Sequence, residues 1–148
     1  MIQRIQSIFL LLAAACAFAL FALPFASVEV PETNVASSIF ADGVYDIQDH
    51  IGTIVLFCLA GGLAFISIFL FNNRKLQMTL SRFAIIFNII GLVLAIILFY
   101  NEVQGMGEEM PDDRLGIFLP ILFIVFTLLG LRFIGKDEKL VKSMDRLR

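Results

Sequence analysis

The chain has 148 residues, of which 59% are hydrophobic and only 16% are charged. Soluble domains are about 45–50% apolar and about 25% charged, and a soluble chain of this length has too little interior to bury the excess. The composition therefore excludes an ordinary soluble domain and indicates an integral membrane protein. The formal net charge of −2 gives no reason to expect a nucleic-acid partner.

Four apolar runs follow one another along the chain. A helix rises about 1.5 Å per residue, so each run is long enough to cross a hydrocarbon core of about 30 Å. A helix also satisfies its own backbone hydrogen bonds where no water is present. We therefore predict an all-α, polytopic membrane protein of one domain, residues 1–148, built as a four-transmembrane-helix bundle. The expected helices cover residues about 5–25, 51–71, 83–100 and 115–134.

The first run, residues 8–25, also has features of a secretory signal peptide. Arg4 precedes the run, and small residues after Pro24 would place a cleavage site near Ala26. The run is nevertheless longer than the ~7–15 apolar residues typical of a signal peptide. Both interpretations stay open on these residues, and we expect a retained helix.

The linkers between the runs sort the charges strongly. The inner loop, residues 72–82, is basic, whereas the outer loops, residues 26–50 and 101–114, hold many Asp and Glu and a single basic residue, Arg114. Every other Lys and Arg falls on one side of a four-span arrangement. The positive-inside rule places that side in the cytoplasm. The sequence therefore predicts that both termini are cytoplasmic.

Polar side chains within the apolar runs would mark a transport path. No Asp, Glu or Lys occurs there, and the candidates are Thr53, Ser67, Asn88 and Thr127. Asn88 is the strongest, because an amide in hydrocarbon needs an interhelical hydrogen bond. We favour a packing contact over an ion path, since one amide makes no path. Pro120 adds a predicted kink to the fourth helix.

Small residues recur at a spacing of four, which lets two helix backbones approach closely. The pairs Cys58/Gly62, Ala60/Ala64 and Gly91/Ala95 follow this pattern and predict helix packing, to which Asn88 adds its interhelical contact. The same spacing would serve an interface between copies of the chain, so the oligomeric state stays open.

Asp46, Asp49 and His50 lie at i, i+3 and i+4 before the second helix. On one helical face they would bring an imidazole beside carboxylates, as in a Zn²⁺ or general-base site. The alternative, which we favour, is an acidic cap on a helix N-terminus, where the dipole favours negative charge. No phosphate loop, nucleophile elbow or His-Glu-x-x-His occurs. We therefore expect no metal, no cofactor and no enzyme activity.

The tail, residues 135–148, carries one apolar helical stripe among basic residues and predicts a short cytoplasmic C-terminal amphipathic helix. Such a helix would lie on the anionic inner leaflet, or dock its stripe in a groove on a protein partner or on the bundle itself. The pattern leaves these alternatives open. The residues predicted to contact a partner or lipid are Arg74, Lys75, Gln77, Lys136, Lys139, Leu140, Lys142, Met144, Arg146, Leu147 and Arg148.

Three segments of the predicted cytoplasmic face are distinctive: Met1-Ile2-Gln3-Arg4-Ile5-Gln6, Asn73-Arg74-Lys75-Leu76-Gln77, and the tail from Lys136 to Arg148. Together they resemble a bacterial family of four-span membrane proteins known only as a domain of unknown function, number 4293, typical of the Bacteroidota. The resemblance implies an inner-membrane location, four helices and a retained first helix. It implies no activity.

These features favour an accessory or scaffolding subunit of a membrane complex. Its cytoplasmic face would engage a membrane-protein complex or a cytoplasmic protein, because the distinctive polar residues gather there while the membrane interior is chemically plain. The alternative is a small transporter or channel, as a single chain or a homo-oligomer, with Asn88, Thr127 and the kink at Pro120 lining its path. Both interpretations expect the lipid bilayer as a partner.

Overall fold

The computed structural model describes residues 3–27, 42–104 and 112–145, and helices dominate it. Three two-residue strands and two short 3₁₀ helices (η1 and η2) complete the described elements. In chain order the elements are α1 (Gln3–Ala19), β1 (Ala26–Ser27), β2 (Val44–Tyr45), η1 (Ile47–Asp49), α2 (Ile51–Phe69), α3 (Arg74–Val103), β3 (Asp112–Asp113), η2 (Leu115–Phe118) and α4 (Leu119–Asp145).

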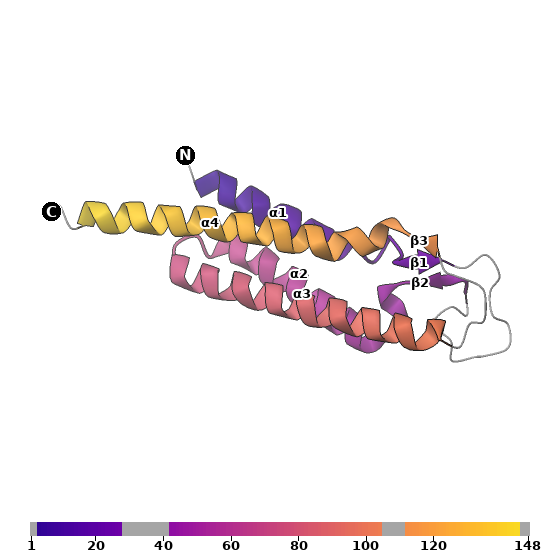
Figure 1. The fold of residues 1–148 in the computed structure, drawn as a ribbon. Coiled ribbons are helices and arrows are strands. Elements are labelled where there is room, and N and C mark those ends of the chain that lie inside the picture. The colour runs from indigo at the N-terminus through magenta and orange to yellow at the C-terminus, as the bar shows by residue number, and fades with distance from the viewer. Residues whose placement is uncertain (1–2, 28–41, 105–111, 146–148) are drawn as a thin grey trace.

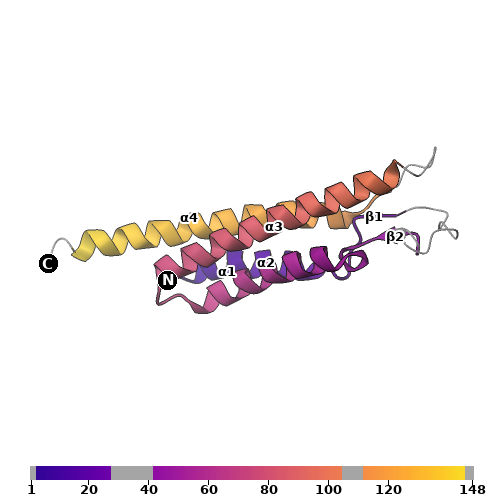
Figure 2. The ribbon, with the colours of Figure 1, turned by 90° about the horizontal axis from the view of Figure 1, so that it is seen from below.

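The four helices pack as a bundle with a square cross-section. In Figure 1, α1 and α4 lie above α2 and α3, and the view turned by 90° in Figure 2 places α3 and α4 above α1 and α2. Each helix therefore contacts two neighbours, and the α3–α4 pair is the least extensively packed. The start of α1, the α2–α3 turn and the end of α4 lie together at one end, here called the basic end. The strands lie at the other end, the sheet end.

The inward face of each helix follows a heptad-like spacing of alternating three and four residues. Such spacing is typical of left-handed bundles whose side chains interdigitate. Small and polar side chains occupy most of these positions, so the helix backbones approach closely. On α3 the buried positions are Gln77, Ser81, Ala84, Asn88, Gly91 and Ala95, and on α2 they include Thr53, Phe57, Ala60, Ala64 and Ser67.

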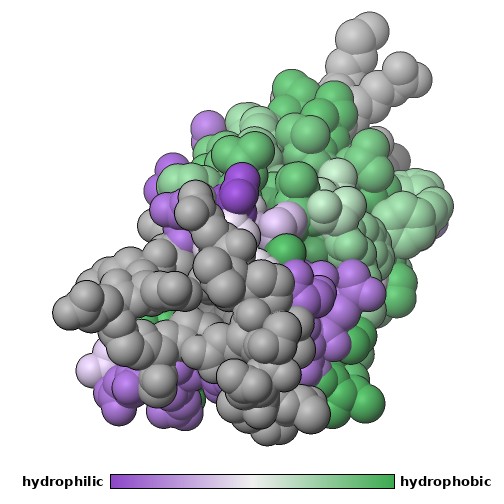
Figure 3. All heavy atoms as spheres, turned by 90° about the vertical axis from the view of Figure 1, so that its right-hand side faces the viewer, coloured by the Kyte–Doolittle hydropathy of each residue, from purple (hydrophilic) through white to green (hydrophobic). Residues whose placement is uncertain are grey.

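Most of the large apolar side chains lie on the outside of the bundle, and only a few, such as Phe57 and Phe123, are buried among the described residues. Ile51 is 76% exposed, and many Ile, Leu and Phe side chains of α2, α3 and α4 are about half exposed. Three helical segments, Ile51–Phe69, Arg74–Val103 and Leu115–Val141, are long and apolar enough to cross a membrane, and α1 is a shorter apolar helix. Seen from the sheet end, hydrophilic residues gather at that end and apolar flanks lie behind them (Figure 3). The length of these helices and their apolar outer surface are consistent with a membrane protein.

A three-stranded antiparallel sheet of order β2-β1-β3 joins the two outer connections. Ala26 pairs with Tyr45 on one side and Asp113 on the other. The Tyr45 hydroxyl donates a 2.9 Å hydrogen bond to the carbonyl of Ala95, which ties the sheet to α3. Burial, with a smaller contribution from Asp49, raises the pKa of this hydroxyl, so Tyr45 remains a donor.

The helix bounds differ from those predicted, because hydropathy follows contact with lipid and not the extent of a helix. The predicted inner loop, residues 72–82, is wrong: α3 begins at Arg74, where the Asn73 side chain caps it by accepting from the Leu76 amide. The predicted fourth helix ends too early as well, since α4 continues through the charged tail to Asp145 as one helix. No separate amphipathic helix is present in the described part of the tail. Conversely, α1 ends at Ala19, before the predicted residue 25.

Gly116 is required where η2 meets the end of the first apolar run. Its amide donates to the Pro24 carbonyl at 2.9 Å, and a Cβ added there would lie 2.2 Å from that oxygen. This contact is with backbone, so it cannot be relieved by turning a side chain. The glycine therefore fixes how closely η2 approaches the chain after α1.

We expect Gly116→Ala to lower the free energy of unfolding by about 1–3 kcal/mol, the usual cost of forcing atoms into a packed site. The control is Gly135→Ala on α4, where an added Cβ meets nothing within 4 Å. That change should raise stability by about 0.5–1 kcal/mol through helix propensity. Thermal unfolding of the two variants in one detergent checks this, and equal effects would contradict it.

Candidate functional site

The basic end contains a hollow of about 400 Å³ between the α2–α3 turn and α4. Polar, basic and acidic side chains line it together with two apolar ones, so it suits a polypeptide segment better than a hydrocarbon chain. α4 projects beyond the other three helices on this side, as both Figure 1 and Figure 2 show. The lining residues are Phe71, Asn72, Asn73, Arg74, Lys75, Glu138 and Val141.

Arg74 holds the two walls of this hollow together. It is the first residue of α3, and its guanidinium Nη1 donates a 3.0 Å hydrogen bond to the carbonyl oxygen of Asp137 on α4. The neighbouring Lys75 is exposed and lies at the same rim. The predicted basic cluster is therefore split: Arg74 is a structural clasp, and Lys75 is accessible.

The projecting part of α4 presents the described residues of the predicted stripe. Leu140 is 53% exposed and Val141 38% exposed, and Lys139 beside them is also exposed. Lys136 lies over the Phe133 ring, with its Nζ 5.6 Å from the centroid, so its stem covers the bundle surface. The side chains of Lys142 and Met144, and all of Arg146, Leu147 and Arg148, lie outside the described residues.

Gln77 was predicted to contact a partner or lipid, and this is wrong, because the side chain is completely buried in the bundle. It belongs to a set of buried polar side chains that face the interior. Within the described part of the chain, their amide, hydroxyl or carboxylate atoms have no hydrogen-bond partner. The set is Gln6 on α1, Gln77, Ser81 and Asn88 on α3, and Oδ2 of Asp137 on α4.

Two contacts between helices show that most of these side chains lie near the basic end. The Phe9 and Phe133 rings stack with centroids 5.4 Å apart, so Gln6, one turn from Phe9, is level with the α4 turn that ends near Asp137. The Arg74–Asp137 bond brings the first turns of α3, including Gln77, to the same level. Three helices therefore direct polar side chains into one layer of the interior.

The interior is closed beyond Asn88. Gly91, one turn further along α3, lies against the ring of Phe57. A Cβ added at this glycine would lie 3.3 Å from Cζ of that ring. Phe57 and Phe123 are completely buried and belong to the two apolar clusters of the core. Polar groups thus extend about half-way into the bundle from the basic end and meet aromatic rings there.

The structure distributes the predicted packing residues unevenly. Asn88, Gly91 and Ala95 are buried on the inner face of α3. Cys58 is half-buried and a free thiol, and Gly62 has nothing within 4 Å of an added Cβ. The glycine of α2 that meets α1 is Gly61, whose added Cβ would lie 3.0 Å from Cβ of Ala17.

The acidic group before α2 acts as a pair of caps. The Asp46 side chain caps η1, Oδ2 of Asp49 accepts from the Asp46 amide at 2.7 Å, and Nδ1 of His50 accepts from the Gly52 amide at 3.1 Å. Each of the three side chains thus caps a helix start or holds a cap in place. Among the described residues, no group of three or more His, Cys, Asp or Glu has a metal-binding arrangement.

The model of one protein family, described as a domain of unknown function (DUF4293), matches residues 2–147. The chain belongs to the DUF4293 family. The match covers both the projecting α4 and α1, so the DUF4293 chain includes the hollow and the buried polar layer as parts of one domain. No curated protein and no solved structure matches the chain.

Sequence reasoning missed Gln6, Gln77, Ser81 and Asp137 as buried residues of the DUF4293 bundle. All but one lie outside the predicted apolar helices, where an exposed loop or tail was expected. The available signal was the heptad phase of α3. Counting back from Asn88 by seven and eleven residues gives Ser81 and Gln77.

The capping box formed by Asp46 and Asp49 at η1 makes the stability of the folded chain depend on pH. Burial raises the pKa of Asp49 from its ordinary 3.8 to about 6, and the charges of Asp46 and Asp42 add to the rise. The folded state then holds a proton that the unfolded state loses between pH 4 and pH 6, so stability falls as pH rises through this window.

We expect Asp49→Asn to flatten this fall, because the amide oxygen keeps the bond to Asp46 and carries no charge. Unfolding temperatures of variant and parent should agree near pH 4, and the variant should be more stable at pH 7. Glu102→Gln, which removes a carboxylate at the end of α3, is the control. A parent and variant with parallel pH profiles would show that Asp49 has an ordinary pKa.

Proposed function

We propose that the chain is a small accessory or scaffolding subunit of a complex in the bacterial inner membrane. In this proposal it crosses the bilayer four times, its basic end faces the cytoplasm, and a partner protein binds at that end. The partner would place an acidic and apolar segment in the hollow beside α4, where it would meet Lys75, Lys139 and the exposed side chains of Leu140 and Val141.

The projection of α4 past the bundle is the observation that carries this proposal. A helical extension of this kind buries little apolar surface against its own chain. Packing against a partner would therefore stabilise it more than the parts of the helix that are already packed. Here the extension begins beside the Arg74 bond to Asp137, which fixes its direction. The hollow at its base adds a shaped surface of mixed chemistry.

Two further features support the four-span orientation. α1 packs along α2 and α4, and its 17 residues reach about 26 Å, close to the thickness of the hydrocarbon core. Basic residues collect at the end with both termini, whereas Asp42, Asp46, Asp49 and Asp112 lie at the sheet end. The positive-inside rule favours the basic end as the cytoplasmic one.

We expect the double variant Lys75→Gln with Lys139→Gln to lose a partner that co-purifies with the native protein in mild detergent. Both side chains are exposed at the proposed docking surface, and both substitutions keep the helix and remove only charge. Quantitative mass spectrometry of the purified material should show at least a severalfold loss of that partner.

The matched control is Arg82→Gln, which removes one exposed basic residue from the same helix outside the hollow. It should retain the partner. If both variants retain it equally, or if the native protein purifies without any stoichiometric partner, the docking proposal is wrong.

A second candidate function is a small transporter or channel, and the buried polar layer favours it. Unpartnered amides inside a membrane bundle are costly, about 1–3 kcal/mol each, unless a guest or water satisfies them. Gln6, Gln77 and Asn88 could take part in a path that begins at the basic end. Phe57 and Phe123 close that path in the present conformation, so we rank this candidate second.

Under this second candidate, Gln77→Met abolishes ion flux in liposomes without lowering the unfolding temperature, since a side chain of similar volume replaces two unpartnered polar groups. The control is Gln104→Met, an exposed cap residue at the sheet end of α3. Liposomes with the native protein that pass no Na⁺, K⁺ or protons would exclude the candidate.

A further inference from the structure

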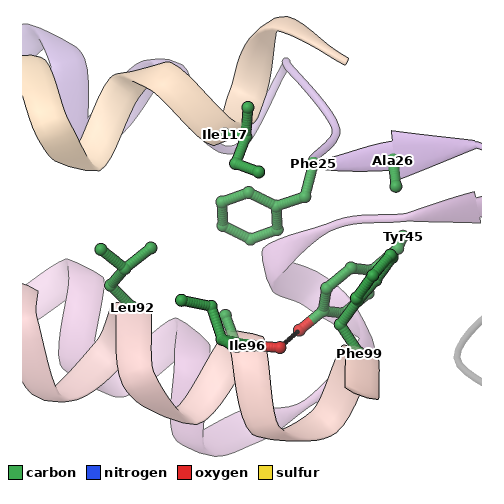
Figure 4. Close-up of a pocket in the computed structure, with 8 residues that line it drawn as sticks. Phe25, Ala26, Tyr45, Leu92, Ile96, Phe99 and Ile117 are labelled. Atoms are coloured by element: carbon green, nitrogen blue, oxygen red, sulfur yellow. Dashed lines mark hydrogen bonds between the residues drawn. The ribbon is translucent and has the colours of Figure 1, made fainter. Parts of the chain in front are cut away.

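A cavity of about 60 Å³ lies at the sheet-end half of the bundle, between α3 and η2. Figure 4 shows the Phe25 ring entering the space with Ile117 above it and Leu92 and Ile96 below. Segments far apart in the sequence thus build one pocket. Its lining is Phe25, Ala26, Tyr45, Leu92, Ala95, Ile96, Phe99 and Ile117.

The lining side chains are suited to hydrocarbon alone. Seven of the eight carry no side-chain polar atom, and the eighth, Tyr45, directs its hydroxyl to the Ala95 carbonyl (dashed line in Figure 4). A polar guest would lose its hydrogen bonds with water and gain none from these side chains. The chemistry of the pocket therefore selects an apolar guest.

The pocket is partly open and lies between α3 and η2, the segment that leads into α4, and the α3–α4 pair is the least extensively packed in the bundle. Ile96 at its wall is 56% exposed, and the same flank carries Val93 and Ile97, each about half exposed. In a bilayer this apolar flank faces lipid, because the helix that carries it is long enough to span the membrane.

A cationic group stands next to the pocket. The Arg114 amide donates to the Phe25 carbonyl at 2.9 Å, its Nε donates to Oγ of Ser27 at 2.6 Å, and its carbonyl accepts from the Ile117 amide at 3.3 Å. Arg114 is exposed, and it is the single basic residue in the two outer connections. An arginine with donors to spare binds phosphate well.

We propose that this pocket and Arg114 bind one phospholipid of the leaflet at the sheet end. Part of one acyl chain fills the cavity and continues along the α3–α4 seam, and the phosphate lies at the Arg114 guanidinium. This inference rests on the membrane placement of the helices and is independent of the docking proposal at the basic end.

The test uses native mass spectrometry of the full chain in detergent, after delipidation and titration with phosphatidylglycerol. The chain contains no Trp, so Ile96→Trp introduces one indole at the pocket wall. Ile97→Trp places the same indole on the same helix outside the lining and is the matched control. We expect Ile96→Trp to weaken binding of the most tightly held lipid at least tenfold and Ile97→Trp to leave it unchanged.

Arg114→Gln forms the second arm. Loss of one charge-assisted contact should weaken phosphatidylglycerol binding about tenfold. Equal lipid retention by the two Trp variants, or full retention by Arg114→Gln, would overturn the proposal. Co-purification of a stoichiometric membrane protein that Ile96→Trp displaces, with no retained lipid, would also overturn it, because the pocket would then hold a protein segment.

Discussion

The close approach of four helix backbones along seams of small residues is the constraint on which this structure depends. In a membrane, lipid tails are as apolar as leucine, so burying large side chains gives no advantage, and contact between backbones does. Gly61 lies against the Ala17 methyl group, which brings α2 close to α1, and Gly91 makes room for the Phe57 ring between α2 and α3. Most of the large Ile, Leu and Phe side chains are consequently turned outward. A single bulky residue in a seam would separate two helices along much of their length.

The interior of the bundle changes in chemistry along its axis, from polar in the half at the basic end to apolar in the half at the sheet end. Towards the basic end, Gln6, Gln77 and Asp137 occupy inner positions, whereas towards the sheet end the interior holds Phe57 and Leu20. Amide and carboxylate groups in the interior are expensive unless bonded, so their concentration in one half is a property that packing alone does not require. The apolar half carries the tie of Tyr45 to α3 and the apolar pocket beside Arg114. The proposed protein partner and the proposed lipid would therefore bind at opposite halves of the bundle.

Hydropathy predicted the four helices from the sequence, because most of each apolar run lies within a helix, and three of these helices have a length and composition compatible with a membrane. It failed where the helices leave the apolar region: α3 extends back to Arg74 and α4 forward to Asp145, under the control of the Asn73 cap and of ordinary helix propensity. Predicting that Gln77 is buried requires the heptad phase of α3 as well as the composition. The pairing of Ala26 with Tyr45 and Asp113 has no local signal, since two-residue strands form only after the helices have brought the loops together.

α3 contributes residues to the hollow, to the buried polar layer and to the apolar pocket. Its packing against α4 is the least extensive between neighbouring helices. That seam is held at its two ends. Arg74 bonds Asp137 at the basic end, and at the sheet end the chain of contacts runs from Ala95 through Tyr45 and the sheet to η2. Between these ends lie the lateral pocket and the buried polar layer. If a partner binds at the basic end as proposed and draws α4 aside, it must first break the Arg74 bond, so this clasp would also limit access to the interior.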